Sequence, residues 1–156
     1  MNPLKFSDLG LSDPIQLALK SRNHLTPTPI QAKAIPELLK GSDVLGIAQT
    51  GTGKTAAFAL PILHRLAQNR GNGKRRDPRA LVLAPTRELA IQIGEEFAAY
   101  GKNLHLRQCV IFGGVKQNPQ VNALKRGVDI IIATPGRLLD HFERGKLLLT
   151  GVQVMV

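Results

Sequence analysis

The segment Ala48-Gln49-Thr50-Gly51-Thr52-Gly53-Lys54-Thr55 decides the fold class of this 156-residue chain. Its glycines let the backbone wrap around a row of phosphates with the N–H groups pointing inward. A helix that begins directly after it adds the positive end of the helix dipole. Lys54 is placed to reach the β- and γ-phosphates of a nucleotide, and the Thr55 hydroxyl is placed to hold a magnesium ion. The segment therefore predicts a phosphate-binding loop.

The residues on either side of this segment support the prediction. The apolar run 44–48 predicts a short buried strand before the loop, and residues 56–60 continue as a helix after it. Ala48 stands where the general pattern has its first glycine, so the strict pattern fails at one position. The alternative is an ordinary turn between a strand and a helix, but turn chemistry does not explain Gly-Lys-Thr at this junction.

Composition narrows the class of protein further. The length fits one domain, the apolar runs are too short to span a membrane, and no signal-type apolar region follows Met1, so we expect a cytoplasmic protein. Cys109 is the only cysteine, which excludes an internal disulfide and predicts a buried thiol in an apolar strand. The net charge of +10 indicates a polyanionic partner, most simply nucleic acid, although a basic surface that only confers solubility is the alternative.

Secondary-structure signals alternate along the chain. One helix is expected from a cap at Asp13 to about Arg22, and a second from a cap at Thr28 to about Lys40. Strands are then expected over 44–48, 80–84, 107–112, 128–133 and 152–156, and helices over 54–68, 86–100, 118–125 and 136–143. The basic segment 70–79 is interpreted as a solvated connection, with a phosphate contact as the alternative. Apolar strands separated by helices predict an α/β fold with a parallel β-sheet flanked by helices on both faces.

Further motifs stand in a fixed order around the phosphate loop. Thr26-Pro27-Thr28-Pro29-Ile30-Gln31 precedes it, Pro85-Thr86-Arg87-Glu88-Leu89-Ala90 follows the second expected strand, Gly113-Gly114 the third and Thr134-Pro135-Gly136-Arg137 the fourth. Together they resemble the first half of a bacterial DEAD-box ATP-dependent RNA helicase of the RhlE type, over nearly the whole chain. The resemblance implies a RecA-like P-loop domain. Residues 1–41 would be an N-terminal helical segment with the adenine-recognition (Q) motif, and residues 42–156 would be RecA-like helicase domain 1, incomplete at its C-terminus.

The resemblance assigns adenine recognition to Gln31, whose amide suits the donor and acceptor edge of adenine, so ATP would be preferred over GTP. Phe6 would stack on the adenine face. The alternatives are a solvent-facing helix residue for Gln31 and a core anchor for Phe6. Lys54 and Thr55 are the expected catalytic residues, with Thr55 holding Mg²⁺ through the nucleotide. The expected ATP-binding residues are Phe6, Thr26, Gln31, Ala48, Gln49, Thr50, Gly51, Thr52, Gly53, Lys54 and Thr55.

The resemblance also implies a sequence-nonspecific RNA surface that contacts sugars and phosphates. Thr86 and Thr134 have the residue type of helix caps, and a helix start presents N–H groups to a phosphate. Arg87 and Arg137 could instead form internal ion pairs, for example with Glu88 or Asp140. The expected RNA-binding residues are Pro85, Thr86, Arg87, Gly113, Gly114, Thr134, Pro135, Gly136 and Arg137.

In the family, the last residues of this sequence lead into an Asp-Glu-Ala-Asp motif, and a second RecA-like domain supplies arginine fingers. Neither is present before Val156, so we expect this fragment to bind adenine nucleotide without hydrolysis or unwinding, and to self-associate through uncovered apolar surface. Three alternatives stay open. They are a P-loop GTPase or kinase, although no Asn-Lys-x-Asp guanine motif is present, a module that binds RNA or protein without chemistry, and a DNA helicase of the same superfamily.

Overall fold

The computed structural model describes residues 2–69 and 77–156 and divides the chain into two compact units. Unit 1 comprises Met1–Gln68 and Glu96–His105, and unit 2 comprises Asn69–Glu95 and Leu106–Val156. The helix α4 (Arg87–Tyr100) contributes its first part to unit 2 and its last part to unit 1. Residues 70–76 of the predicted basic connection 70–79 lie outside the described residues.

Unit 1 is helical. It contains the short 3-10 helix η1 (Phe6–Asp8), α1 (Asp13–Ser21), α2 (Pro29–Leu39) and α3 (Lys54–Gln68). The cap of α1 is Ser12, so the prediction of Asp13 as the cap is wrong by one residue, and Asp13 is the first helical residue instead. Thr28 caps α2 as predicted, and Gly41, with φ of +88°, follows its end. The apolar faces of α1, α2 and α3 form a core with Ile15, Leu19, Ile35, Leu60 and Leu63 fully buried.

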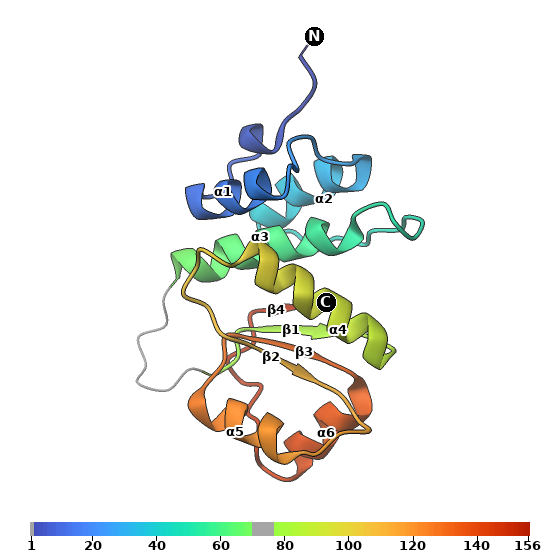
Figure 1. The fold of residues 1–156 in the computed structure, drawn as a ribbon, viewed down its shortest axis with the longest axis vertical. Helices are drawn as coiled ribbons and strands as arrows, with labels where there is room; N and C mark the ends of the chain where they lie inside the picture. Colours follow the sequence, from blue (N-terminus) through green and yellow to red (C-terminus); the bar gives the residue numbers. More distant parts are fainter. Residues whose placement is uncertain (1, 70–76) are drawn as a thin grey trace. The chain divides into compact units, whose positions relative to one another are not determined.

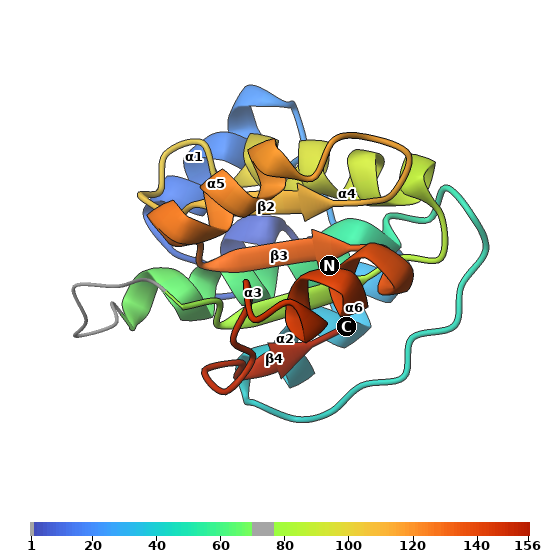
Figure 2. The ribbon, with the colours of Figure 1, turned by 90° about the horizontal axis from the view of Figure 1, so that it is seen from below.

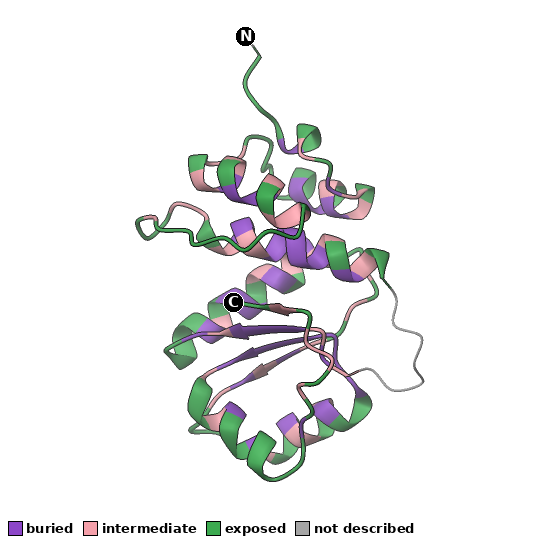
Figure 3. Cartoon of the chain, turned by 180° about the vertical axis from the view of Figure 1, so that it is seen from behind, coloured by how far each residue is buried: buried purple, intermediate pink, exposed green. Residues whose placement is uncertain are grey.

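The strand predicted over 44–48 is wrong. These residues are neither strand nor helix, and Leu45 and Ile47 are 88% and 85% exposed. Figure 2 shows the segment as a long teal trace, and Figure 3 shows it mostly green, which marks exposed residues. The apolar composition of the run gives it β propensity, but a strand forms only where a neighbouring strand accepts its N–H and C=O groups. In the described residues the sheet does not include this run.

Unit 2 is built on a parallel four-stranded sheet with the order β2-β3-β1-β4 (Figure 2). Its strands are β1 (Ala80–Leu83), β2 (Gln108–Ile111), β3 (Ile130–Ala133) and β4 (Val154–Met155). Each lies inside a predicted range, shortened at the ends where pairing stops. The register aligns Ile111, Ala133 and Leu83, the last residues of the three longer strands. The carboxyl ends of these strands therefore form one straight edge of the sheet.

Helices cover both faces of this sheet, as predicted (Figure 1). On one face lie α5 (Asn118–Arg126) and α6 (Pro135–Glu143), whose Leu124 and Leu138 pack with Leu81 and Ile131 in one buried cluster. On the other face lies the first part of α4. All four residues of β3 are buried, which agrees with an apolar strand that is covered on both faces of the sheet.

A buried carboxylate ties the amino ends of the strands together. Asp129 is 4% exposed, pairs with the Arg79 guanidinium at 3.1 Å and accepts a hydrogen bond from the Arg107 backbone N–H at 2.8 Å. Arg79 precedes β1, Arg107 precedes β2 and Asp129 precedes β3, so one side chain fixes the start of three neighbouring strands. Breaking such a buried pair is costly because an unpaired charge would remain in the interior.

Candidate functional site

The predicted phosphate-binding loop, residues 48–55, lies in unit 1 and runs into the first residues of α3. Gly51 and Gly53 have φ of +84° and +81°, a left-handed conformation that other residues rarely adopt, so the glycines are needed for the shape of the loop. The Lys54 ammonium donates to the Ala48 carbonyl at 2.7 Å, and the Thr52 hydroxyl donates to the Gln49 carbonyl at 2.6 Å. The loop is thus closed on itself, with its lysine bonded to a loop oxygen.

A side-chain clamp joins this loop to the start of α2. The Gln31 amide nitrogen donates to the Gly53 carbonyl at 3.1 Å, and its amide oxygen accepts from the Thr28 backbone N–H at 2.9 Å. The Thr28 hydroxyl donates to the Thr52 carbonyl at 2.7 Å. Gln31 is 6% exposed, so the alternative of a solvent-facing helix residue is wrong. A Cβ added at Gly53 would collide with the Gln31 amide, which gives this glycine a second reason to be small.

The remaining expected adenine contacts lie in different environments. The Phe6 ring is 4% exposed, which places it as a core anchor in this conformation. Its backbone N–H donates to Leu25 at 3.0 Å, and its carbonyl accepts from the Gln16 amide at 2.9 Å. Thr26 is exposed in the bend before α2. Stacking of Phe6 on a base would therefore require the ring to leave its buried position.

An open cavity of about 510 Å³ lies beside the loop in unit 1. It is lined largely by apolar residues of the start of α2 and of the exposed run, together with Lys33 and Thr52. Residues 44–48, which do not join the sheet, form part of the wall of this cavity. The cavity therefore exists only with these residues in their present position.

The expected RNA motifs meet at the carboxyl edge of the sheet in unit 2. Pro85, Thr86 and Arg87 follow β1, Gly113 and Gly114 follow β2, and the segment Thr134–Arg137 follows β3. Because these strands are neighbours with aligned ends, the loops stand next to one another. Backbone bonds join them, since the Ala84 N–H donates to Ala133 and the Thr134 N–H donates to Ile111, both at 2.9 Å. Open α/β sheets bind ligands at this edge.

Two helices begin at this edge. The Thr86 hydroxyl accepts a hydrogen bond from the Leu89 backbone N–H at 3.2 Å, so its predicted capping role is confirmed. Thr134 occupies the cap position of α6 without a side-chain cap bond, and Pro135 is at the first position of this helix. Pro135 and Gly136 are exposed. The start of α6 therefore faces solvent beside the glycine loop.

The two arginines flank the Gly113-Gly114 loop. The Arg87 guanidinium lies over the Phe112 ring, 5.5 Å from its centroid, a cation–π distance. The Arg137 guanidinium donates from both terminal nitrogens to the Val115 carbonyl, at 3.1 and 3.0 Å. Within the described ranges neither arginine forms an ion pair with Glu88 or Asp140. Among the described residues, neither guanidinium at this edge is therefore paired with a carboxylate.

Two residues of this edge were missed by sequence reasoning. Gln120 and His141 are buried, and the His141 ring nitrogen Nε2 lies 2.8 Å from the Gln120 amide oxygen. Burial lowers the pKa of His141, Arg137 and Arg144 lower it further, and Asp140 opposes them. The burial of Gln120 could have been predicted from its spacing in the sequence. It lies four residues before the apolar Leu124, and residues four apart share one face of a helix, here the buried face of α5.

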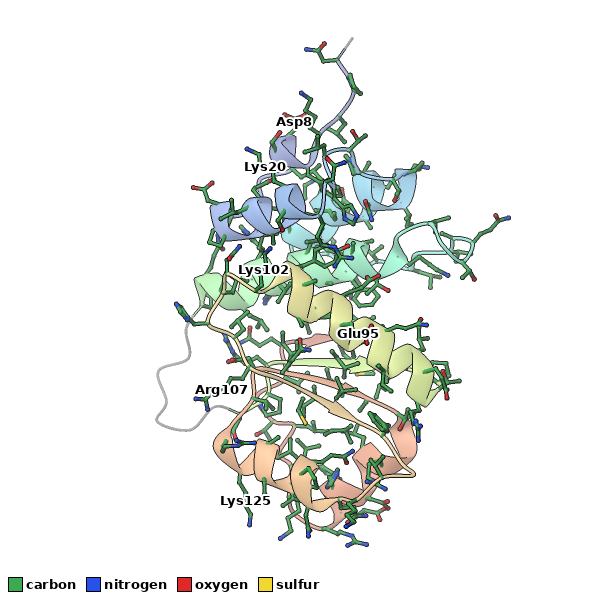
Figure 4. All side chains as sticks on the ribbon, in the orientation of Figure 1. Asp8, Lys20, Glu95, Lys102, Arg107 and Lys125 are labelled. Carbon is green, nitrogen blue, oxygen red and sulfur yellow. The ribbon has the colours of Figure 1, made fainter. Side chains whose placement is uncertain are left out.

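The described residues also bear on three other features, namely a metal site, a membrane-spanning helix and a reactive cysteine. They contain no group of three or more His, Cys, Asp or Glu side chains arranged for a metal ion, and no helix of membrane-spanning length and hydropathy. Cys109 is buried, as predicted, and burial raises the pKa of its thiol to about 11, so it is protonated at neutral pH and unreactive. Basic residues also occur at the opposite edge of the sheet, where Arg107 and Lys125 are labelled in Figure 4.

Comparison with known proteins identifies the family. The family model of the DEAD/DEAH box helicases matches residues 28–156 of this chain. ATP-dependent RNA helicase DeaD of Escherichia coli (strain K12) is 47% identical over 152 residues, which is 97% of this chain and 23% of that protein. ATP-dependent rRNA helicase RRP3 of Gibberella zeae is 50% identical over 141 residues, which is 90% of this chain and 28% of that protein.

A solved structure shows the same fold. The crystal structure of a DEAD box protein from the hyperthermophile Methanococcus jannaschii matches 97% of this chain and 40% of its own, with a TM-score of 0.87 and 39% identity. This agrees with the predicted RecA-like α/β fold. The chain spans about a quarter of the length of the curated relatives it matches, 23% for DeaD and 28% for RRP3. On the family profile and these identities, the chain belongs to the DEAD/DEAH box helicase family.

Proposed function

We propose that this chain is the adenine-nucleotide-binding and RNA-binding part of an ATP-dependent RNA helicase, in which ATP hydrolysis is coupled to local unwinding of RNA duplexes. The observation that carries the proposal is the alignment of three motif loops at the carboxyl edge of β1, β2 and β3. The helicase activity named for the relatives DeaD and RRP3 supports it.

The proposed RNA contacts are made by the edge loops. Arg87 and Arg137 supply positive charge, and the start of α6 at Thr134 supplies backbone N–H groups for a phosphate oxygen. Gly113 and Gly114 are exposed, and a Cβ at Gly113 would meet nothing within 4 Å, so a sugar–phosphate backbone can approach there closely. Contacts of this kind position RNA without reading its bases.

The proposed nucleotide contacts are made by the loop before α3. Its left-handed glycines, the start of α3 and the Lys54 ammonium fit a triphosphate, because Lys54 already bonds an oxygen acceptor in the loop. On binding, Lys54 would exchange the Ala48 carbonyl for phosphate oxygens, and Gln31 would exchange the Gly53 carbonyl for the adenine edge. Thr55, the second residue of α3, would hold Mg²⁺, which neutralises phosphate charge when it is bound.

We assign the RhlE type, with an N-terminal adenine-recognition segment over residues 1–41 and a RecA-like helicase domain over residues 42–156. Hydrolysis requires groups that position the attacking water and stabilise the transferred phosphoryl group. The sequence contains no Asp-Glu-Ala-Asp motif, so the chain alone should bind nucleotide without appreciable turnover. An acidic motif and a second RecA-like domain with arginine fingers would complete the enzyme.

Two further assignments belong to this proposal. The protein would act in the cytoplasm, where RNA and ATP are both present. The chain alone would self-associate through the edge strand β4 and the residue after it, since Met155 is 68% and Val156 41% exposed. Size-exclusion chromatography over a range of concentrations tests this second point, and a monomer at every concentration would contradict it.

The nucleotide assignment is tested by calorimetric titration of the chain with ADP and with GDP. We expect ADP to bind more tightly and Lys54→Ala to abolish binding of both, because the lysine contacts phosphate. Gln31→Ala should remove the preference for ADP, whereas Glu37→Ala, an exposed change on the same helix away from the cavity, should leave it. Equal affinity for ADP and GDP in the wild-type chain would contradict the adenine assignment.

A further inference from the structure

A buried polar network lies beneath the proposed RNA surface in unit 2. The Gln120 amide oxygen accepts from His141 Nε2 at 2.8 Å and from Arg137 Nη1 at 3.3 Å. The Gln120 amide nitrogen donates to the Phe112 carbonyl at 3.0 Å. Gln120 is on α5, and Arg137 and His141 are on α6, so the network joins two helices to the segment that follows β2.

The hydrogen bonds fix the state of His141. Because the Gln120 amide nitrogen is used by the Phe112 carbonyl, the amide group facing His141 is its oxygen, which can only accept. His141 Nε2 must therefore carry the proton. Its other ring nitrogen, Nδ1, is buried and has no hydrogen-bond partner in the part of the chain that the structure describes. The imidazole is thus a neutral donor held in one tautomer.

The network in turn fixes Arg137. Three hydrogen bonds, two to the Val115 carbonyl and one to the Gln120 amide oxygen, use three of the five N–H donors of its guanidinium. The remaining donors can face a phosphate. Arg137 is held between α5 and residue 115, directly after Gly113 and Gly114, so the position of its charge depends on the position of Gln120.

We propose that Gln120 and His141 are positioning residues for RNA binding, which act by holding the Arg137 guanidinium and the segment 112–115 in one arrangement at the carboxyl edge of the sheet. Neither side chain touches RNA, since both are buried. The proposal rests on the proposed RNA function of this edge and adds two residues to it.

The test measures the affinity of the purified chain for a fluorescent single-stranded oligouridylate. Gln120→Leu and His141→Leu, which keep volume and remove the hydrogen bonds, should weaken binding about two- to tenfold, the factor expected for one net hydrogen bond. His141→Gln places an amide N–H near the position of Nε2 and should retain most of the affinity. Asn122→Ala, an exposed change on α5, is the control for effects on the helix.

A double-mutant cycle separates positioning from general damage to the fold. If Gln120 acts through Arg137, then Gln120→Leu should have little further effect on affinity in an Arg137→Ala chain. An equal loss in both backgrounds, or no loss in the wild-type background, would overturn the proposal. Absence of salt-sensitive RNA binding by the wild-type chain would instead overturn the proposed RNA function, and the positioning role with it.

A second measurement does not depend on whether the variants fold. Nitrogen-15 NMR of the wild-type imidazoles reports which ring nitrogen of His141 carries the proton. We expect the proton on Nε2 at neutral pH. A proton on Nδ1 would contradict the network on which the proposal stands, whatever the affinities of the variants.

Discussion

At the scale of single residues, two buried glutamines each hydrogen-bond separate segments together, which their neighbours in the sequence do not indicate. Gln31 connects the start of α2 to the phosphate-binding loop, and Gln120 connects two helices beneath the edge loops. Both are buried and use donor and acceptor together. A primary amide suits such places because it satisfies one donor and one acceptor in the interior without carrying charge.

Replacing Gln31 should destabilise the protein even without nucleotide. Gln31→Ala leaves the Thr28 N–H and the Gly53 carbonyl without their partner, at a cost of about 1–3 kcal/mol in the free energy of unfolding. Urea denaturation followed by circular dichroism measures this. Lys33→Ala on the same helix is the control, and a Gln31→Ala chain as stable as wild type would show that the clamp contributes nothing.

Stability should fall in mild acid because two histidines are held neutral. Burial lowers the pKa of His64 and of His141 below the ordinary value of 6.5. Between the lowered pKa and 6.5 the unfolded chain binds more protons than the folded chain, so the free energy of unfolding decreases as the pH falls through 6.5. The loss should level off below the pKa of the folded state.

Denaturant midpoints at a series of pH values test this. His64 accepts a hydrogen bond from the Ser12 N–H at Nδ1, whereas His141 donates one through Nε2. A replacement for His141 must therefore keep a hydrogen-bond donor. His141→Gln keeps the donor and cannot titrate in this range, and it should make the pH dependence shallower. A pH profile identical to wild type would show that His141 does not contribute to it.

At the scale of elements, α4 approaches β2 closely at a glycine. A Cβ on Gly94 would come within 2.5 Å of the Val110 side chain, and the Gln108 amide nitrogen donates to the Gly94 carbonyl at 2.7 Å. Glycine normally weakens a helix interior, so its presence here marks a close contact between helix and sheet.

Gly94→Ala should therefore destabilise the protein, although alanine is the better helix former. Overpacking at a close contact costs about 1–3 kcal/mol, more than the ~1 kcal/mol gained in helix propensity. Gly136→Ala is the matched control, because a Cβ there meets nothing within 4 Å. Thermal unfolding should show a lower midpoint for Gly94→Ala and an equal or higher one for Gly136→Ala, and the opposite ranking would refute the close-contact account.

At the scale of the whole molecule, we expect charge to govern the proposed affinity for RNA. The net charge is +10, and Arg87 and Arg137 lie at the carboxyl edge of the sheet without carboxylate partners among the described residues. Each phosphate neutralised on a single strand contributes a slope of about −0.7 to a plot of log affinity against log salt concentration. RNA binding should therefore weaken steeply with salt.

Removing one phosphate contact should make this slope shallower by about 0.7, in addition to lowering the affinity. Arg87→Ala is the variant to measure, with Lys125→Ala as the control, since Lys125 lies at the opposite edge of the sheet (Figure 4). Titrations of single-stranded RNA and DNA of equal length, at several salt concentrations, give both the slope and the preference for RNA. A slope that Lys125→Ala changes as much as Arg87→Ala would place the binding surface elsewhere.

By itself, the sequence determined the local elements and the family. The helices α2 and α3 begin where Thr28 and Lys54 predict, and each described strand lies inside a predicted apolar run, because caps, glycines and hydrophobic periodicity act over a few residues. The tertiary structure decided which strands pair. It gave the order β2-β3-β1-β4 and left out the run 44–48, because strand pairing depends on partners distant in sequence. It also decided the hydrogen bonds between Gln120, Arg137 and His141, which exist only once α5 and α6 pack together.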